Sequence, residues 1–253
     1  MVDLSYIGEV RNNSKGTEMK IIAARKKSDI DIQFLDNYGY IVKNQTYVNF
    51  KRGQIKNPYD ITVYGIGYIG DGKHQSWENH LPTKAYNAWL TMLLRCYNKD
   101  KQEFHKAYYG KCTVCEEWYN FQTFAEWYEK HEYTVNERLH IDKDILDPTC
   151  KRYSPETCML VPQKINMLFM NKYNKYGLPN GIRKISNGYE ARFNATLVGK
   201  GNTVEETYEY YAKAKEKRIR ELAEEYIEII PKYIYNALLN YKVDISNDKN
   251  YAA

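Results

Sequence analysis

The stretch Leu139–Asn166, LHIDKDILDPTCKRYSPETCMLVPQKIN, places a histidine, two closely spaced aspartates and a distant asparagine in one compact segment. RLHID (138–142) and CMLVP (158–162) are short runs of the kind that form strands. Proline is favoured at the first position of a helix, so Pro162 predicts that a helix follows the second strand. Asn166 is then expected one turn into that helix, and the segment is predicted to fold as strand, loop, strand and helix.

Such a unit can gather the side chains that hydrolyse a phosphodiester bond. The neutral imidazole of His140 can take a proton from water. The oxygen atoms of Asp142, Asp144 and Asn166 can hold a divalent cation against the scissile phosphate. The same residue types also fit a surface turn that has no catalytic role, and taken singly they do not separate a metal-dependent nuclease site from such a turn.

The composition limits the classes of protein that the chain can belong to. Its 253 residues are 43% hydrophobic, but no apolar run approaches the roughly 18 residues that a membrane-spanning helix needs. The start, MVDLSYIGEVRNN, lacks the apolar stretch of a signal peptide. Five cysteines without an export signal indicate reduced thiols. We therefore expect a cytoplasmic protein with no membrane partner, and the abundance of Lys, Asn, Ile and Tyr suggests a low-GC bacterium or its phage.

Residues 1–75 are predicted to form a small β module that resembles a barrel or a sandwich. Short runs rich in Ile, Val, Tyr and Phe alternate there with turn-forming segments, and the expected strands are 19–25, 30–36, 38–44, 46–51 and 60–70. Lys51 and Arg52 are candidate contacts to DNA. They fit a polar hairpin equally well.

Two aromatic helices are expected in the middle of the chain. TKAYNAWLTMLLRCY (83–97) and VCEEWYNFQTFAEWYEKH (114–131) both carry apolar side chains at helical spacing. Thr83 and Asn120 are suitable N-caps for them. We interpret these helices as the scaffold that supports the segment Leu139–Asn166.

The C-terminal part is predicted to be a three-stranded sheet followed by a helix. GLPNGIRKISNGYEARFNATLVGKGN (177–202) contains three strand-like runs separated by SNG and GKGN. In the helix that follows, Thr203 and Glu206 form a capping box, and Pro231 ends it. Residues 172–220 hold 11 Lys and Arg against 5 Asp and Glu, a surplus that suits either phosphate binding or a solvated helix face.

Three segments of the middle region together resemble the HNH endonuclease family, in particular phage-encoded members. They are WLTMLLRCY (89–97), VCEEWYNFQTFAEW (114–127) and DKDIL…YSPETCMLVPQKIN (142–166). The resemblance implies a ββα-metal centre in which His140 is the general base and Asn166 belongs to the metal site. It also implies a Mg²⁺ or Mn²⁺ cofactor, with Asp142 and Asp144 as candidate ligands.

The chain departs from the family pattern at two positions. Active family members usually carry Asp or His before the general base, where this chain has Leu139. Asn166 also stands where a second imidazole often does. The departure at Leu139 leaves open a catalytically degenerate DNA-binding protein. The near-neutral middle region and the acidic tail also permit a phage inhibitor of a host defence nuclease, whose partner would be a host protein.

Four cysteines raise the question of a structural zinc site. Cys112 and Cys115 have the spacing of a zinc knuckle, and Cys150 with Cys158 could complete four ligands. The second pair is separated by seven residues, which disfavours zinc. Buried thiols are the alternative interpretation.

The segment GIRKISNGYEARFNATLVGKGNTVEETYEYYAKAKEKRI (181–219) resembles the Apetala2-type DNA-binding domain. The resemblance implies a sheet that contacts double-stranded DNA through Arg183, Lys184, Tyr189, Arg192 and Lys200. Judged as a residue on a strand, Tyr189 also fits a core position.

The complete prediction is a modular α+β protein. Its parts are the β module (1–75), the HNH-like domain (76–172), the Apetala2-like domain (173–230) and a C-terminal helix or tail (231–253).

Overall fold

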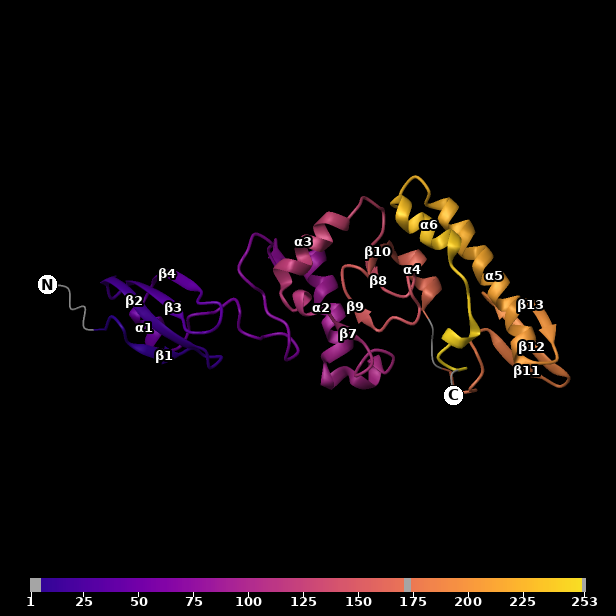
Figure 1. Cartoon of the computed structure of the whole chain (residues 1–253), viewed down its shortest axis with the longest axis horizontal. Coiled ribbons are helices and arrows are strands. Elements are labelled where there is room, and N and C mark those ends of the chain that lie inside the picture. Colours follow the sequence, from indigo (N-terminus) through magenta and orange to yellow (C-terminus); the bar gives the residue numbers. More distant parts are fainter. Residues whose placement is uncertain (1–5, 171–173, 252–253) are drawn as a thin grey trace. The chain divides into compact units, whose positions relative to one another are not determined.

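The computed structural model describes residues 6–170 and 174–251 (Figure 1). The chain is mixed α+β, as predicted, with several small sheets between its helices. Within the described ranges, no helix combines the length and the apolar character that crossing a bilayer requires. The chain divides into two compact units, which are described separately.

The first unit comprises residues 1–104 and 116–126 and begins with an antiparallel sheet of order β1-β2-β3-β4. Side chains alternate between buried and partly exposed along β3, as the two-residue period of a strand requires. The inward side chains, among them Ile30 and Ile32, pack with Phe50. The bounds are β1 (Val10–Asn12), β2 (Glu18–Lys26), β3 (Asp29–Phe34) and β4 (Ile41–Gln45).

This sheet is open, with β1 and β4 at its edges, where the sequence predicts a barrel or a sandwich. Two expected strands take other conformations. Residues Tyr47–Lys51 form helix α1, because the Thr46 side chain accepts a hydrogen bond from the Asn49 amide and caps it. Residues 60–70 form turns with two isolated bridges, one between Val63 and Gly67 and one between Tyr68 and Asn120.

The rest of the first unit contains the first predicted aromatic helix and residues 121–126 of the second, which continues into the second unit. Thr83 caps α2, and the Asn120 side chain accepts from the Gln122 amide at the start of α3, so both predicted caps are confirmed. Trp89 is fully buried and donates from Nε1 to the carbonyl of Trp118 at 2.7 Å. The elements are β5 (Trp77–Glu78), β6 (Leu81–Pro82), α2 (Lys84–Tyr97), η1 (Lys99–His105), η2 (Glu116–Tyr119) and α3 (Phe121–His131).

The second unit comprises residues 105–115 and 127–253. Two short strand pairs and a helix form its first part. Strand β7 (Thr113–Val114) pairs in parallel with β9 (Arg152–Tyr153), and β8 (Leu139–Asp142) pairs antiparallel with β10 (Met159–Pro162). Helix α4 (Gln163–Phe169) follows β10 directly.

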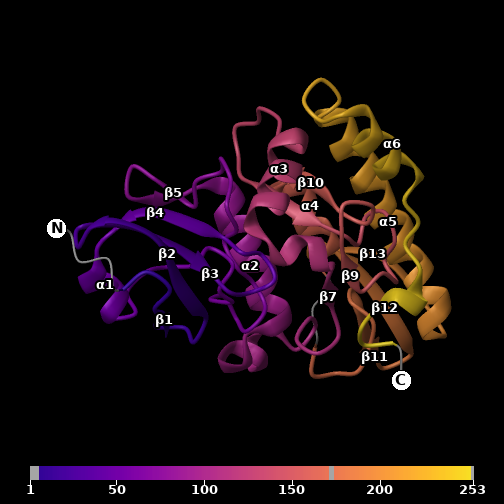
Figure 2. The same cartoon turned by 60° about the vertical axis from the view of Figure 1, so that its left-hand side comes forward.

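A hydrophobic core joins this hairpin and α4 to two long-range partners, α5 (Val204–Glu225) and α6 (Lys232–Asn240). Met159, Ile165, Ile219 and Ile234 all lie in it, each at most 1% exposed. Figures 1 and 2 show α4 beside α5 and α6 from two directions. The core therefore fixes the strand that carries His140 onto the C-terminal helices.

The C-terminal sheet has the order β11-β12-β13 and packs against α5, as predicted. Its strands are β11 (Ile182–Ile185), β12 (Gly188–Phe193) and β13 (Thr196–Gly201). The second turn differs from the prediction. It lies at Asn194 and Ala195, both with positive φ, a pattern typical of a two-residue type I′ hairpin, so the predicted GKGN turn is largely strand.

Of the two hydrogen bonds of the predicted capping box at the start of α5, the structure has the one accepted by Thr203. The Thr203 hydroxyl accepts from the Glu206 amide at 3.1 Å, whereas the Glu206 carboxylate accepts from the amide of Asn202. Pro231 caps α6, so α5 ends before it, at Glu225. A short turn of 3-10 helix, η3 (Ile245–Asn247), follows α6.

Candidate active site

The hairpin β8–β10 and helix α4 bring His140 and Asn166 together. Val161 lies opposite His140 in the antiparallel pair, and the chain turns into α4 immediately after Pro162. One helical turn then carries Asn166 back over the hairpin, where its amide nitrogen lies 3.1 Å from Nδ1 of His140. The strand–strand–helix order is as the sequence predicts.

The contact links the tautomer of His140 to the orientation of the Asn166 amide. With the amide oxygen of Asn166 turned toward the ring, Nδ1 holds the proton and Nε2 is the basic nitrogen. With the amide nitrogen toward the ring, Nδ1 holds the lone pair and is occupied by the contact. For His140 to abstract a proton through Nε2, the amide oxygen of Asn166 must face the ring. This orientation exchanges the amide oxygen and nitrogen of Asn166, which are similar in size, and leaves the 3.1 Å distance to Nδ1 unchanged.

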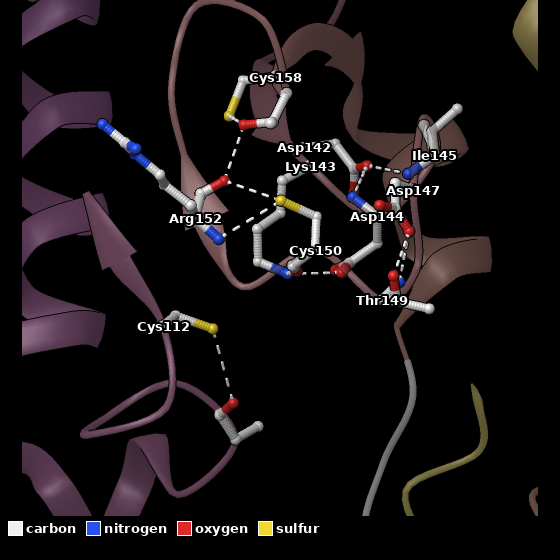
Figure 3. Close-up of polar contacts among 12 residues, drawn as sticks. Cys112, Asp142, Lys143, Asp144, Ile145, Asp147, Thr149, Cys150, Arg152 and Cys158 are labelled. Carbon is white, nitrogen blue, oxygen red and sulfur yellow. Dashed lines mark hydrogen bonds and ion pairs between the residues drawn. The ribbon is translucent and has the colours of Figure 1, made fainter. Parts of the chain in front are cut away.

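Asp142 serves the turn that follows β8. It is 6% exposed, and its Oδ1 accepts hydrogen bonds from the backbone amides of Asp144 and Ile145, each at 2.8 Å (Figure 3). Burial, followed by the charge of Asp144, raises the pKa of Asp142 to about 7. The two amide donors hold this side chain in place as the closing group of the turn.

Asp144 forms an ion pair with the adjacent residue. Its Oδ1 lies 2.5 Å from Nζ of Lys143, which is 3% exposed and also donates to the carbonyl of Cys150 at 3.0 Å (Figure 3). Asp144 and Lys143 line a cavity of about 80 Å³ in the second unit, and neither His140 nor Asn166 is among the residues that line it. The two predicted acidic ligands are therefore engaged elsewhere, while His140 and Asn166 meet.

A magnesium or manganese site at His140 does not fit this arrangement. Asn166 is a neutral ligand, Leu139 is a buried aliphatic residue, and the oxygens of Asp142 and Asp144 have the roles described above. Among residues 6–170 and 174–251, no three His, Cys, Asp or Glu side chains are grouped as a metal site would require.

The segments that carry four of the cysteines are brought together by the pairing of β7 with β9. Because β7 pairs with β9, the Cys112–Cys115 segment runs alongside residues 150–154. The three thiols drawn in Figure 3 have separate neighbours: Cys112 lies 3.9 Å from the carbonyl of Ala107, Cys150 lies 3.3 Å from that of Arg152, and Cys158 lies 3.7 Å from the hydroxyl of Thr157. Burial raises the pKa of Cys112 and that of Cys158, the latter to about 12.

The predicted DNA-contacting residues of the C-terminal sheet fall into two groups. Arg183, Glu190 and Lys200 lie opposite one another across the three strands. Arg183 and Arg192 each place Nε 3.0 Å from Oε1 of Glu190, and their side chains are 69% and 44% exposed. The two guanidinium groups, Arg192 first, lower the pKa of Glu190. This exposed face carries three cations around one carboxylate.

Tyr189 and Lys184 belong to the second group. They lie opposite each other in β11 and β12, and Tyr189 packs against the cluster of Ile182, Ala191 and Tyr208 beneath α5. This is the core position that Tyr189 also fits from sequence. Lys184 is exposed near the end of the sheet.

In the first unit, Lys51 and Arg52 are both exposed at the C-terminal end of α1. Lys51 lies 3.4 Å from the carboxylate of Glu9 and 5.6 Å above the ring of Tyr47. Part of its charge is therefore neutralised within the module.

Sequence reasoning missed Lys143 and Glu190. A lysine between two aspartates suggests a solvated charge. In the structure the Lys143 side chain is buried, and its Nζ forms an ion pair with Asp144. Glu190 alternates with Arg192 on one strand and pairs with Arg183 on the next, a pattern that the sequence does contain.

No family model, curated protein or solved structure matches the chain. The function is therefore inferred from the geometry of its own residues and from the resemblances of its motifs.

Proposed function

We propose that the chain is an HNH-type endonuclease that holds duplex DNA on its C-terminal sheet and cleaves the phosphodiester backbone at His140. The observation that carries this proposal is the contact between His140 and Asn166 at the corner between β8 and α4. It joins the two residues to which the proposal gives catalytic roles.

In this proposal the residues of the chain have distinct roles. Asn166 orients the imidazole through Nδ1, and Nε2 takes the proton from the attacking water. Arg183, Arg192 and Lys200 contact backbone phosphates from the exposed face of the sheet. Since the arrangement does not fit a divalent cation, no step of the reaction is assigned to one.

A second function is favoured by that misfit. With Leu139 beside His140 and Asp142 holding a turn, the chain also suits a regulator that binds DNA through the same sheet without cutting it. Both functions share the basic face, so DNA binding alone does not separate them.

The experiment is a nicking assay on supercoiled plasmid with Mg²⁺, with Mn²⁺ and with EDTA, run beside a duplex-binding assay. Cleavage that His140→Ala abolishes while binding persists supports the endonuclease. Salt-sensitive binding of the wild-type chain with no cleavage under any of these conditions supports the regulator and refutes the endonuclease.

A further inference from the structure

The cavity of about 80 Å³ in the second unit lies apart from the His140–Asn166 pair and has its own chemistry. It is lined by residues 107–112, the turn at 143–151, the face of α5 at 208–215 and the C-terminal residues 241–249, together with Phe169, Met170 and Asn180. A buried water needs about 10–15 Å³ of such space, so the cavity has room for several waters or for one tetrahedral anion.

Lysines and aspartates both line the cavity, but the aspartates already have partners. Asp144 is paired with Lys143 at 2.5 Å. The Asp248 carboxylate accepts from the backbone and side-chain amides of Asn180 at 2.9 Å, and its other oxygen accepts from the amide of Asn250. Asp244 caps η3 through the amide and hydroxyl of Ser246. These carboxylates are used by the fold.

Lys215 remains without an acidic partner. In the described part of the chain it has no ion pair within 4 Å, and its Nζ lies over the ring of Tyr211, 6.0 Å from the ring centroid. Burial lowers the pKa of Lys215, which the more distant Asp248 only partly offsets. Lys151 also lines the cavity and is exposed, with no acid paired to its side chain among the described residues.

Three of the four tyrosines that line the cavity come from α5 and the C-terminal segment. The hydroxyls of Tyr208, Tyr211 and Tyr241 make no hydrogen bond to any described residue. Burial raises the pKa of each, that of Tyr211 to about 12, so all three are protonated at neutral pH and can donate. One ammonium with several hydroxyl donors around the same cavity matches a ligand rich in acceptor oxygens.

We propose that this cavity binds a phosphate group, with Lys215 as its central cation and Lys151 at its opening. The phosphate belongs either to a small molecule, such as inorganic phosphate or a mononucleotide, or to a nucleic-acid backbone. The proposal is independent of cleavage at His140, because neither His140 nor Asn166 lines the cavity.

The test is the melting temperature and binding heat of the full chain titrated with inorganic phosphate, against chloride at equal ionic strength. We expect saturable binding by the wild type and at least a tenfold weaker affinity in Lys215→Met. Lys213→Met is the matched control, since Lys213 is an exposed lysine of the same helix that pairs with Glu209. Tyr211→Phe, which removes one hydroxyl and keeps the ring, should weaken binding severalfold and serves if Lys215→Met does not fold.

The source of the phosphate is tested with thymidine 5′-monophosphate and a duplex oligonucleotide on the same variants. If Lys215→Met loses phosphate and nucleotide binding but keeps duplex affinity, the ligand is a small molecule. If it loses duplex affinity as well, the ligand is a backbone phosphate. A phosphate response no larger than that of chloride, or equal responses in Lys215→Met and Lys213→Met, would overturn the proposal.

Discussion

The side-chain amide of Asn166 contacts Nδ1 of His140 at 3.1 Å, across 26 positions of the chain. Two features of the sequence produce this contact: the register that sets Val161 opposite His140, and the start of α4 directly after Pro162. The hairpin and the helix together place Asn166 where its side chain contacts the ring of His140. The account of catalysis depends on this pair.

Asn166→Ala should reduce cleavage by about 10-fold to 100-fold, because the imidazole loses the group that fixes its orientation. DNA affinity should not change, since Asn166 lies outside the basic sheet face. The pH dependence of cleavage should shift as well, which a purely structural role would not cause. Gln163→Ala, an exposed change on the same helix, is the control. Equal cleavage by the two variants would remove Asn166 from the mechanism.

Asp142→Ala should lower the free energy of unfolding by about 2 kcal/mol, because the amides of Asp144 and Ile145 lose a buried acceptor. Asp142→Asn keeps an oxygen at this position and should cost less. Urea denaturation measures both. Asp147→Ala is the matched control, since its carboxylate closes a similar turn at an exposed position. If Asp142→Ala is no more harmful than the control, Asp142 does not hold the turn.

Replacing Arg183 and Arg192 with Ala should weaken duplex binding and flatten its salt dependence. Each lost phosphate contact removes about 0.9 from the slope of log K against log salt concentration. Fluorescence anisotropy at several salt concentrations gives the slope. Lys213→Ala changes the charge on α5 away from the sheet and should leave the slope unaltered. A slope that stays constant in the double arginine variant would place the DNA on another surface.

Lys215→Met should stabilise the protein at neutral pH by about 1 kcal/mol in phosphate-free buffer, because it removes a poorly solvated ammonium. Burial lowers the pKa of Lys215 below the 10.5 of the unfolded chain, so the wild type gains stability as pH rises toward 10.5. The advantage of the variant should therefore shrink in alkaline buffer. If the difference in free energy of unfolding between Lys215→Met and the wild type is the same at every pH, Lys215 is fully solvated in the folded protein.

The strand–strand–helix unit could be predicted because its signals are local. The apolar runs at LHID and CMLVP, and a proline before the helix, act within a few residues of where they stand. The caps at Thr83 and Thr203 are local in the same way. Where such signals agree, the sequence determines the element and the neighbours of His140.

Other features depended on competition between local signals. Residues 46–51 have the β-rich composition of a strand, yet the Thr46 side chain supplies a helix cap and the segment becomes α1. Asn194 and Ala195 adopt positive φ to form a tight hairpin, although a glycine-rich segment lies only a few residues further on. Composition alone does not decide between these outcomes.

The direction of the aspartate side chains could not be predicted. Alternation along a strand suggests that Asp142 and Asp144 follow His140, but the turn after β8 uses Asp142, and Lys143 pairs with Asp144. The cavity beside them is completed by Tyr241 and Lys215, which are distant in sequence. Such an arrangement is set by the packing of α5 and the C-terminal segment, which no local pattern contains.

The most direct test of the central claim is the rate of plasmid nicking by the wild type and by His140→Ala, with the duplex affinity of both measured in the same buffer. We predict that His140→Ala loses cleavage by at least about 100-fold while its affinity for the duplex is unchanged. Equal nicking by the two proteins, or no nicking by either, would contradict the proposal that His140 acts as the base.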